Sequence, residues 1–275
     1  MTDSPLVLVT GSTDGIGRET ARQLVQRGAR VIVHGRSEAK AAQAHAELQA
    51  QAGGPLPAPV VADLSSLDAV RAMADALLQR DEPLDVLLNN AGIYMRERRP
   101  SEDLLEMTMA VNHFAPFLLT HRLLPLLRRA AAGRVVNVSS IAHTRGSIDL
   151  DDLQLTKGFT HYGAYAASKL ANVLFTVELA GRLGDAVAVN ALHPGVVSTK
   201  LLTEGFQMEG NDTAAKASET SVYLALSDEV AGVTGKYFAH RRVAPHSRLA
   251  DDAELRGRFY QLSCEITGVE PVASP

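Results

Sequence analysis

The sequence predicts an α/β fold, with one doubly wound parallel sheet of about seven strands and helices on both faces. Short β-branched apolar runs alternate with longer segments of helical periodicity, which is the pattern of repeated β-α-β units. The first run, residues 6–10, is apolar almost throughout, as expected for a strand covered on both faces. A glycine-rich turn follows this run and leads directly into a helix-periodic segment. Together these observations favour an open sheet over a barrel or a helical bundle.

The individual elements follow in order. The expected strands are the apolar runs at residues 6–10, 30–34, 58–62, 86–89, 134–139, 187–192 and 236–238. Between them, apolar residues recur at helical spacing, as in the stripe Leu67, Val70, Ala74, Leu77 and Leu78. The long segment 101–131 contains Pro116 and Pro125, so we expect a bent or broken helix there.

The chain is predicted to form one domain. Its 275 residues are 46% hydrophobic, which is enough to bury a sizeable core, and no repeat or low-complexity linker divides them. We expect the domain to cover residues 4–268 and the tail, residues 269–275, to be frayed.

Composition excludes several classes of partner. The net charge of -4, with both signs interspersed, leaves no basic stripe for nucleic acid. Cys264 is the single cysteine, so no intrachain disulfide can form, and a reducing compartment is expected. No signal-like start or 18-residue apolar run occurs, which predicts a soluble, cytoplasmic protein without a membrane partner. The histidines lack metal-ligand spacing, so no metal is expected.

The turn after the first strand has the spacing G-x-x-x-G-x-G. Glycines let the backbone approach a pyrophosphate, whose charge is stabilised at the N-terminus of the following helix. A β-to-α turn that needs glycine for its own geometry is the alternative. The turn favours a Rossmann-type dinucleotide site, with contacts expected from Gly11, Ser12, Thr13, Asp14, Gly15, Ile16 and Gly17.

The end of the second strand bears on the choice of cofactor. Enzymes that use NAD usually place an acidic residue there for the ribose 2′-hydroxyl, whereas this chain has Arg36. A guanidinium suits a 2′-phosphate, so NADP(H) is favoured. NAD(H) stays possible because Glu38 is close, and Arg36 could also be a solvated charge at a helix start.

Tyr165 and Lys169 lie four residues apart, so on a helix they share one face. A phenol is a poor base at neutral pH, but a neighbouring ammonium and an oxidised nicotinamide would lower its pKa. The alternative is a solvated helix pair. Ser139 and Ser140 end a predicted strand, at the edge where ligands of open α/β sheets bind. Asn112 is a poor helix former in an apolar segment, which indicates a hydrogen-bonding purpose or a satisfied core amide.

In combination these residues resemble the classical short-chain dehydrogenase/reductase family over essentially the whole chain. The matching motifs, in the family's order, are residues 10–17, Asp63-Leu64, Asn89 to Gly92, Asn112, Ser140, Tyr165, Lys169 and residues 193–195. The resemblance implies a catalytic tetrad of Tyr165 as general acid/base, Lys169 as its partner and ribose ligand, Ser140 for the reacting oxygen, and Asn112 for a proton-relaying water. It also implies cofactor contacts at Asp63, Leu64, Asn89, Ala91, Gly92, Pro194, Gly195, Val197 and Thr199.

Within the family the chain looks most similar to the retinol-dehydrogenase-like branch, judged by residues 134–143 and 168–175. Ser140 precedes Tyr165 by 25 residues, a long spacing typical of this branch, and therefore Ser140 rather than Ser139 is expected to be catalytic. The resemblance implies a small alcohol or carbonyl substrate. Apolar side chains in 141–164 and 200–213 suggest that this substrate is hydrophobic. The helices near 112–127 and 165–179 are expected to form the interface of a homodimer or homotetramer.

The main interpretation is therefore hydride transfer between a nicotinamide cofactor and an alcohol or carbonyl, with Tyr165 handling the proton. The alternative from another class is a dinucleotide-binding sensor without turnover, although a sensor would not need Ser140, Tyr165 and Lys169 together. Epimerase or dehydratase chemistry is disfavoured because 275 residues leave little room for a substrate domain.

Overall fold

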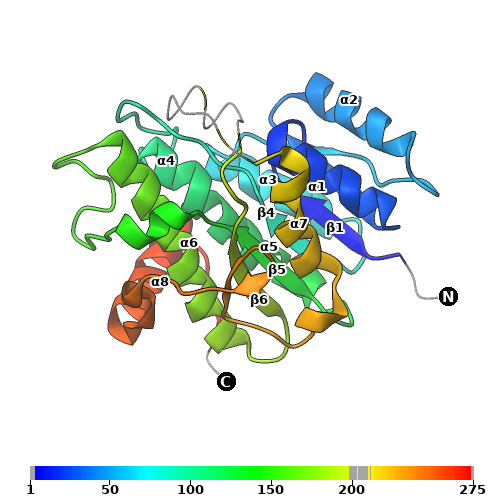
Figure 1. Cartoon of the computed structure of the whole chain (residues 1–275). Coiled ribbons are helices and arrows are strands. Elements are labelled where there is room, and N and C mark those ends of the chain that lie inside the picture. Colours follow the sequence, from blue (N-terminus) through cyan, green and yellow to red (C-terminus); the bar gives the residue numbers. More distant parts are fainter. Residues whose placement is uncertain (1–3, 198–202, 204–209, 211, 274–275) are drawn as a thin grey trace.

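The structure is a computed structural model that describes residues 4–197, 203, 210 and 212–273 (Figure 1). Within this described part, one sheet has the strand order β3-β2-β1-β4-β5-β6-β7-β8. Neighbouring strands pair in parallel, except β7 with β8, which pair antiparallel. The strands are β1 Leu6–Val9, β2 Arg30–Gly35, β3 Val60–Val61, β4 Val86–Asn89, β5 Arg134–Val138, β6 Ala188–His193, β7 Tyr237–Ala239 and β8 Arg242–Val243.

The prediction of a doubly wound, mainly parallel sheet is confirmed, but the expected seven strands were one too few. β8 has only two residues, and both are exposed, so no apolar run marks it in the sequence. β3 is also shorter than the five residues expected. Strands at the edges of a sheet need less apolar sequence than central ones, which is why both edges were predicted poorly.

Helices cover both faces of the sheet, as the periodicity predicts. Alternate residues of β1 enter two separate cores: Leu6 and Leu8 pack with α3, α5, α6 and α8, whereas Val7 and Val9 pack with α1, α2 and α7. The helices are α1 Gly15–Gln26, α2 Glu38–Gln49, α3 Leu67–Leu78, α4 Met107–Met109, α5 Ala115–Leu127, α6 His161–Leu183, α7 Ala214–Leu226 and α8 Ala253–Thr267.

The bent helix expected near the two prolines is interrupted by a π-helical segment, residues 110–114, between α4 and α5. Pro116 lies just after this segment and has no N–H to donate to the Asn112 carbonyl four residues earlier. Pro125, in contrast, is accommodated inside α5. Such π segments are frequent at functional sites, and this one contains Asn112.

The C-terminal helix α8 lies against α5 and α6, at the lower left of Figure 1. His121 Nε2 on α5 is 2.7 Å from the Tyr260 hydroxyl of α8, and His113 Nε2, in the π-helical segment before α5, is 3.1 Å from Ser263 Oγ of α8. Burial lowers the pKa of His121 to about 4, so it is neutral here. The α5 and α6 faces expected to form a subunit interface are thus covered within one chain, and that part of the prediction is wrong.

The segment after α8 is held to the body of the protein, although it was expected to fray from residue 269. The Val272 N–H donates to the Tyr260 hydroxyl at 3.1 Å, and Arg182 Nη1 donates to the Val272 carbonyl at 2.9 Å. Val269 and Val272 also pack against the larger core. The ordered part of the domain therefore extends to at least residue 272.

Among the described residues, no helix has both the length and the apolar character needed to cross a bilayer. The same part of the chain holds no group of three or more metal-ligating side chains.

Candidate active site

The glycine turn between β1 and α1 has the backbone geometry that a phosphate site requires. Gly11 and Gly15 have φ angles of +65° and +55°, in the region that favours glycine. Gly17 has no room for a side chain, because a Cβ there would lie 2.3 Å from the Gly11 carbonyl oxygen and 2.4 Å from Asn90 Nδ2. Asp14 caps α1 by accepting the Gly15 N–H at 2.8 Å. The turn is therefore packed tightly on its inner side.

The first two amides of the turn are used inside the protein. The Gly11 N–H donates to His34 Nδ1 and the Ser12 N–H donates to the His34 carbonyl, both at 3.0 Å. The Ile16 and Gly17 amides, in the first turn of α1, have no acceptor within the helix. Those two amides and the positive end of α1 can bind a pyrophosphate, whereas Gly11 and Ser12 shape the turn.

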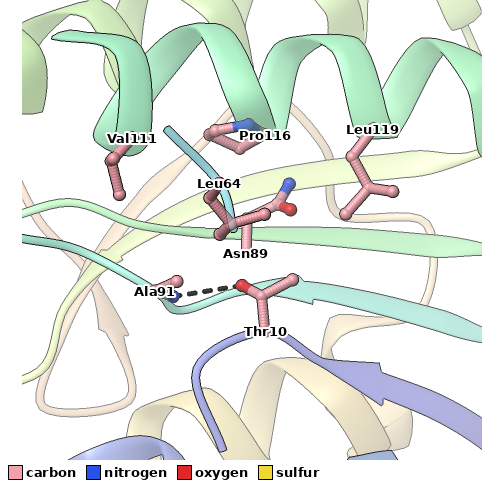
Figure 2. A pocket seen from close by; sticks show the side chains of 7 residues that line it. All are labelled: Thr10, Leu64, Asn89, Ala91, Val111, Pro116 and Leu119. Carbon is pink, nitrogen blue, oxygen red and sulfur yellow. Dashed lines mark hydrogen bonds between the residues drawn. The ribbon is translucent and has the colours of Figure 1, made fainter. Parts of the chain in front are cut away.

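Thr10 connects the turn to the end of β4. Its Oγ1 accepts the N–H groups of Asn90 at 2.9 Å and Ala91 at 3.1 Å, and the second of these bonds is drawn in Figure 2. Asn90 Nδ2 donates to the Thr10 carbonyl at 2.8 Å. These bonds fix the segment from Asn89 to Gly92 against the turn.

Asn89 points into the interior. Its Nδ2 donates to Asn137 Oδ1 at 2.9 Å and to Thr120 Oγ1 at 3.1 Å, and its Oδ1 has no partner in the described part of the chain. Figure 2 shows Asn89 in a small interior pocket with Leu64 and Ala91. The pocket leaves no room for a water molecule. The Asn89 side chain thus links β4 to β5 and α5 by hydrogen bonds. It can affect a cofactor only by holding the end of β4 in place.

Arg36 follows β2 and is exposed. Its guanidinium makes no hydrogen bond or ion pair with the described part of the chain, so it is available to a ligand beside the phosphate turn. Asp63, after β3, is also exposed, and its Oδ1 accepts the Ser65 N–H at 2.9 Å. Both residues therefore lie at the carboxyl edge of the sheet, where the sequence placed them.

Tyr165 and Lys169 lie on the same face of α6, opposite the end of β5. Lys169 Nζ donates to the Val138 carbonyl at 3.0 Å and lies 5.6 Å from the centre of the Tyr165 ring. Ser140 forms a side-chain hydrogen bond with Tyr165. The structure thus brings together the three residues that the sequence proposed for the chemistry.

Burial controls the protonation of this pair. It raises the pKa of Tyr165 to about 12, and the hydrogen bond from Ser140 acts in the opposite direction. Burial also lowers the pKa of Lys169 to about 8. Without a ligand, Tyr165 is therefore a phenol at neutral pH and can donate a proton, while Lys169 is mainly charged but can release a proton near neutrality.

The two serines after β5 have different environments. Ser139 is buried, and its Oγ donates to the Lys169 carbonyl at 2.8 Å. Ser140 is half-buried and faces Tyr165. The structure therefore gives Ser139 a packing role and leaves Ser140 accessible to a substrate.

We expect Ser140→Ala to lower kcat by about 100-fold, because removing one donor to a reacting oxygen costs that much in other enzymes. The matched variant Ser139→Ala should leave kcat nearly unchanged and lower the free energy of unfolding by about 0.5–1.5 kcal/mol, since it removes one buried hydrogen bond to the Lys169 carbonyl. Steady-state kinetics and thermal unfolding of both variants check this. A larger loss of kcat in Ser139→Ala would contradict the assignment.

Asn112 connects the π-helical segment to two other elements. Its Oδ1 accepts the Ile93 N–H at 2.8 Å, and its Nδ2 donates to the Ile93 carbonyl and to Ser168 Oγ, both at 3.0 Å. A Cβ on Gly92 would lie 3.4 Å from both Asn112 Oδ1 and Lys169 Nζ. The Asn112 amide is thus already used for positioning, next to the ammonium of Lys169.

After β6 the chain turns at Gly195, whose φ is +107°. A Cβ there would lie 2.7 Å from Asp212 Oδ2, which also accepts the Val196 N–H at 3.1 Å. Pro194 and Val197 flank this turn, while Thr199 lies outside the described residues.

Two aromatic residues lie near Tyr165: Tyr94, which was not predicted, and Tyr162, which lies in the segment 141–164 expected to contact the substrate. The Tyr94 ring lies 5.5 Å from that of Tyr165, and the Tyr94 hydroxyl is hydrogen-bonded to His161 Nδ1. Tyr162 packs on the same cluster. Tyr94 follows Gly92 by two residues, but an isolated tyrosine in a loop gives no sequence signal of its position.

Comparison with known proteins agrees with this geometry. Residues 5–210 match the short chain dehydrogenase family. An uncharacterised protein from Mycobacterium paratuberculosis is 34% identical, with a TM-score of 0.80 and coverage of 98% of this chain and 97% of that one. A protein from Shigella flexneri described as a short chain dehydrogenase complexed with NADP is 29% identical, with a TM-score of 0.71 and coverage of 86% and 97%. The chain belongs to the short chain dehydrogenase family and is an oxidoreductase.

Its relatives also include retinol dehydrogenases, the branch of the family that the sequence resembles. The chain is 40% identical to retinol dehydrogenase 12 of Bos taurus over 96% of its own length and 86% of that protein. It is 39% identical to human retinol dehydrogenase 14, with the same coverage. The resemblance to the retinol dehydrogenases is thereby confirmed.

Proposed function

We propose that the protein transfers a hydride between NADP(H) and a hydrophobic alcohol or its aldehyde or ketone, with Tyr165 as general acid/base. The observation that carries the proposal is the grouping of Tyr165, Ser140 and Lys169 at the carboxyl edge of the sheet. A bound nicotinamide would supply the hydride donor or acceptor.

The residues of this chain would handle the oxygen and its proton. In reduction, the Ser140 hydroxyl and the Tyr165 phenol both donate hydrogen bonds to the carbonyl oxygen, and Tyr165 gives its proton to the developing alkoxide. The Lys169 ammonium lies 5.6 Å from the ring and favours the phenolate that remains. Oxidation of the alcohol would run through the same positions in reverse.

The packed turn supports a dinucleotide as the cofactor. Gly17 lacks space for even one methyl group, and the Ile16 and Gly17 amides have no acceptor within α1. Arg36 supports NADP(H) because its guanidinium has no partner in the described part of the chain. Two relatives of known structure, from Shigella flexneri and Escherichia coli, are described as complexes with NADP and NADPH.

We expect Arg36→Gln to raise the Kd for NADPH by about 10- to 100-fold, the size of a lost charge-assisted hydrogen bond to a phosphate. The Kd for NADH should change by less than about twofold, because NADH has no 2′-phosphate. Fluorescence titration with both cofactors measures this. The control is Arg128→Gln, another exposed arginine, which should change neither Kd. Equal weakening of both cofactors in Arg36→Gln would contradict the role.

The substrate is proposed to be hydrophobic. Ile141, next to Ser140, has 56% of its surface exposed, and Tyr94 and Tyr162 lie partly buried around Tyr165. An exposed apolar side chain beside a reactive hydroxyl is consistent with an apolar ligand. The printed names of the relatives, retinol dehydrogenases, point in the same direction.

The experiment for the whole proposal is a titration of the purified protein with NADPH and NADH, followed by a panel of aldehydes and ketones. Loss of reduced-nicotinamide absorbance with apolar carbonyls is the expected result. Binding without turnover on a broad panel would favour a sensor, and binding of neither cofactor would overturn the proposal.

A cytoplasmic location and a homo-oligomeric state are part of the proposal. The single cysteine, Cys264, is buried and suits a reducing compartment. A homodimer or homotetramer would need surfaces other than the covered faces of α5 and α6. Light scattering at micromolar concentration measures the assembly, and a monomer would contradict it.

A further inference from the structure

His34, near the end of β2, is only 2% exposed and lies between the phosphate turn and β3. Its backbone is bonded to Ser12 in both directions: the His34 N–H donates to Ser12 Oγ, and the Ser12 N–H donates to the His34 carbonyl, each at 3.0 Å. The side chain makes two more bonds, to Gly11 and Ala62. His34 therefore contacts both the glycine turn and Ala62, which follows β3, and these two segments border the proposed cofactor site.

The partners of the ring fix its tautomer. The Gly11 N–H can only donate, so His34 Nδ1, at 3.0 Å, must be unprotonated. Nε2 then carries the hydrogen and donates to the Ala62 carbonyl, at 3.3 Å. Burial lowers the pKa of His34 to about 4, which agrees with a neutral ring at physiological pH.

These two bonds join segments that are far apart in sequence. Gly11 is the first residue of the glycine turn, with a φ of +65°, and its bond to His34 Nδ1 fixes the direction of its N–H. Ala62 directly precedes Asp63 and Leu64, the pair expected beside the adenine. A rigid five-membered ring with both nitrogens bonded sets the distance between the two segments.

We propose that His34 is a positioning residue of the dinucleotide site, which acts by accepting the Gly11 N–H while its bond to the Ala62 carbonyl fixes the orientation of the ring. This inference rests on the proposed function, since it assigns His34 a role in binding the cofactor of that reaction. His34 touches neither substrate nor reacting atoms in this role.

Two conservative substitutions test the two hydrogen bonds of the His34 ring separately. His34→Asn places an amide oxygen close to the position of Nδ1 and keeps an acceptor for Gly11. His34→Gln places its amide near Nε2 and keeps only the contact to Ala62. His34→Leu removes both bonds at similar volume.

We expect His34→Leu and His34→Gln to raise the Kd for NADPH by about tenfold or more, the loss that one hydrogen bond commonly causes. His34→Asn should stay within about threefold of the parent protein, and kcat at saturating NADPH should change less than about twofold in all three. The readout is fluorescence titration with NADPH, together with the KM for NADPH and kcat.

The control is His121→Asn, at another buried histidine, which bonds Tyr260 far from the turn. His121→Asn should lower the melting temperature without changing the Kd for NADPH. This result would show that a loss of stability alone does not weaken cofactor binding. Two results would overturn the inference when the parent enzyme binds NADPH and turns over: the same NADPH affinity in His34→Asn and His34→Gln, or an unchanged Kd in His34→Leu. If the parent binds neither NADPH nor NADH, the proposed function itself is overturned, and the inference with it.

A measurement on the unsubstituted protein covers the case in which the variants do not fold. Long-range ¹⁵N–¹H spectra of the labelled protein report which ring nitrogen of His34 carries the hydrogen. A neutral ring protonated at Nε2, with shifts at Nδ1 and the Gly11 amide on addition of NADPH, is the expected result. An imidazolium, the Nδ1–H tautomer, or no response to bound NADPH would overturn the inference.

Discussion

Tyr165→Phe is expected to lower kcat by about 100- to 10,000-fold, the usual contribution of a positioned general acid. The change removes only the hydroxyl that is hydrogen-bonded to Ser140 and leaves the ring against Tyr94. Because no cofactor contact of the turn is altered, the Kd for NADPH should stay within about threefold. Single-turnover measurement of NADPH oxidation with an active aldehyde separates the chemical step from binding.

Tyr162→Phe is the matched control, since Tyr162 belongs to the same aromatic cluster but does not bond Ser140 in the proposed mechanism. Its kcat should fall by less than about fivefold. If Tyr162→Phe lost as much activity as Tyr165→Phe, the proton would have to pass through a different group. Unchanged turnover in Tyr165→Phe would refute the general acid assignment.

Gly17→Ala is expected to damage both the stability of the fold and the binding of the cofactor. The new Cβ would lie 2.3 Å from the Gly11 carbonyl oxygen, a backbone atom that cannot move without displacing the turn. We expect a loss of about 3 kcal/mol or more in the free energy of unfolding, at the upper end for overpacking. NADPH affinity should fall by more than about tenfold, because α1 is pushed away from the phosphate position. Chemical unfolding and cofactor titration measure the two effects.

Gly181→Ala provides the control, because this glycine lies in α6 and a Cβ there would meet nothing within 4 Å. Here alanine should raise the free energy of unfolding by about 0.5–1 kcal/mol through helix propensity and leave the Kd for NADPH unchanged. Equal tolerance of alanine at both positions would mean that the turn is looser than the structure indicates.

The central sheet and its covering helices could be predicted from the sequence because each strand there is buried on both faces. β1 illustrates this: Val7 and Val9 enter one core and Leu6 and Leu8 the other, so the whole run must be apolar. The edge strands β3 and β8 are short and partly exposed, and therefore carry little pattern. The packing of α8 on α5 and α6 depends on contacts distant in sequence, such as that between His121 and Tyr260, which periodicity does not reveal.

In the candidate site, too, some residues could be predicted from the sequence and others could not. Tyr165, Lys169 and the glycine turn are predictable because their spacing along a helix or turn fixes their geometry. The interior direction of Asn89 depends on Asn137 and Thr120, which come from other elements, and a motif cannot report it. The role proposed for His34 is hidden for a similar reason, since its partners lie in two other segments of the chain.

The most direct test of hydride transfer at this site uses NADPH carrying deuterium at the transferred position of the nicotinamide. The enzyme is incubated with an apolar aldehyde, and the product is analysed by mass spectrometry and NMR. We expect one deuterium on the carbinol carbon of the alcohol in the parent enzyme and almost none in the same time with Tyr165→Phe. Absence of the label from the alcohol, or consumption of NADPH without formation of alcohol, would contradict the proposed reaction.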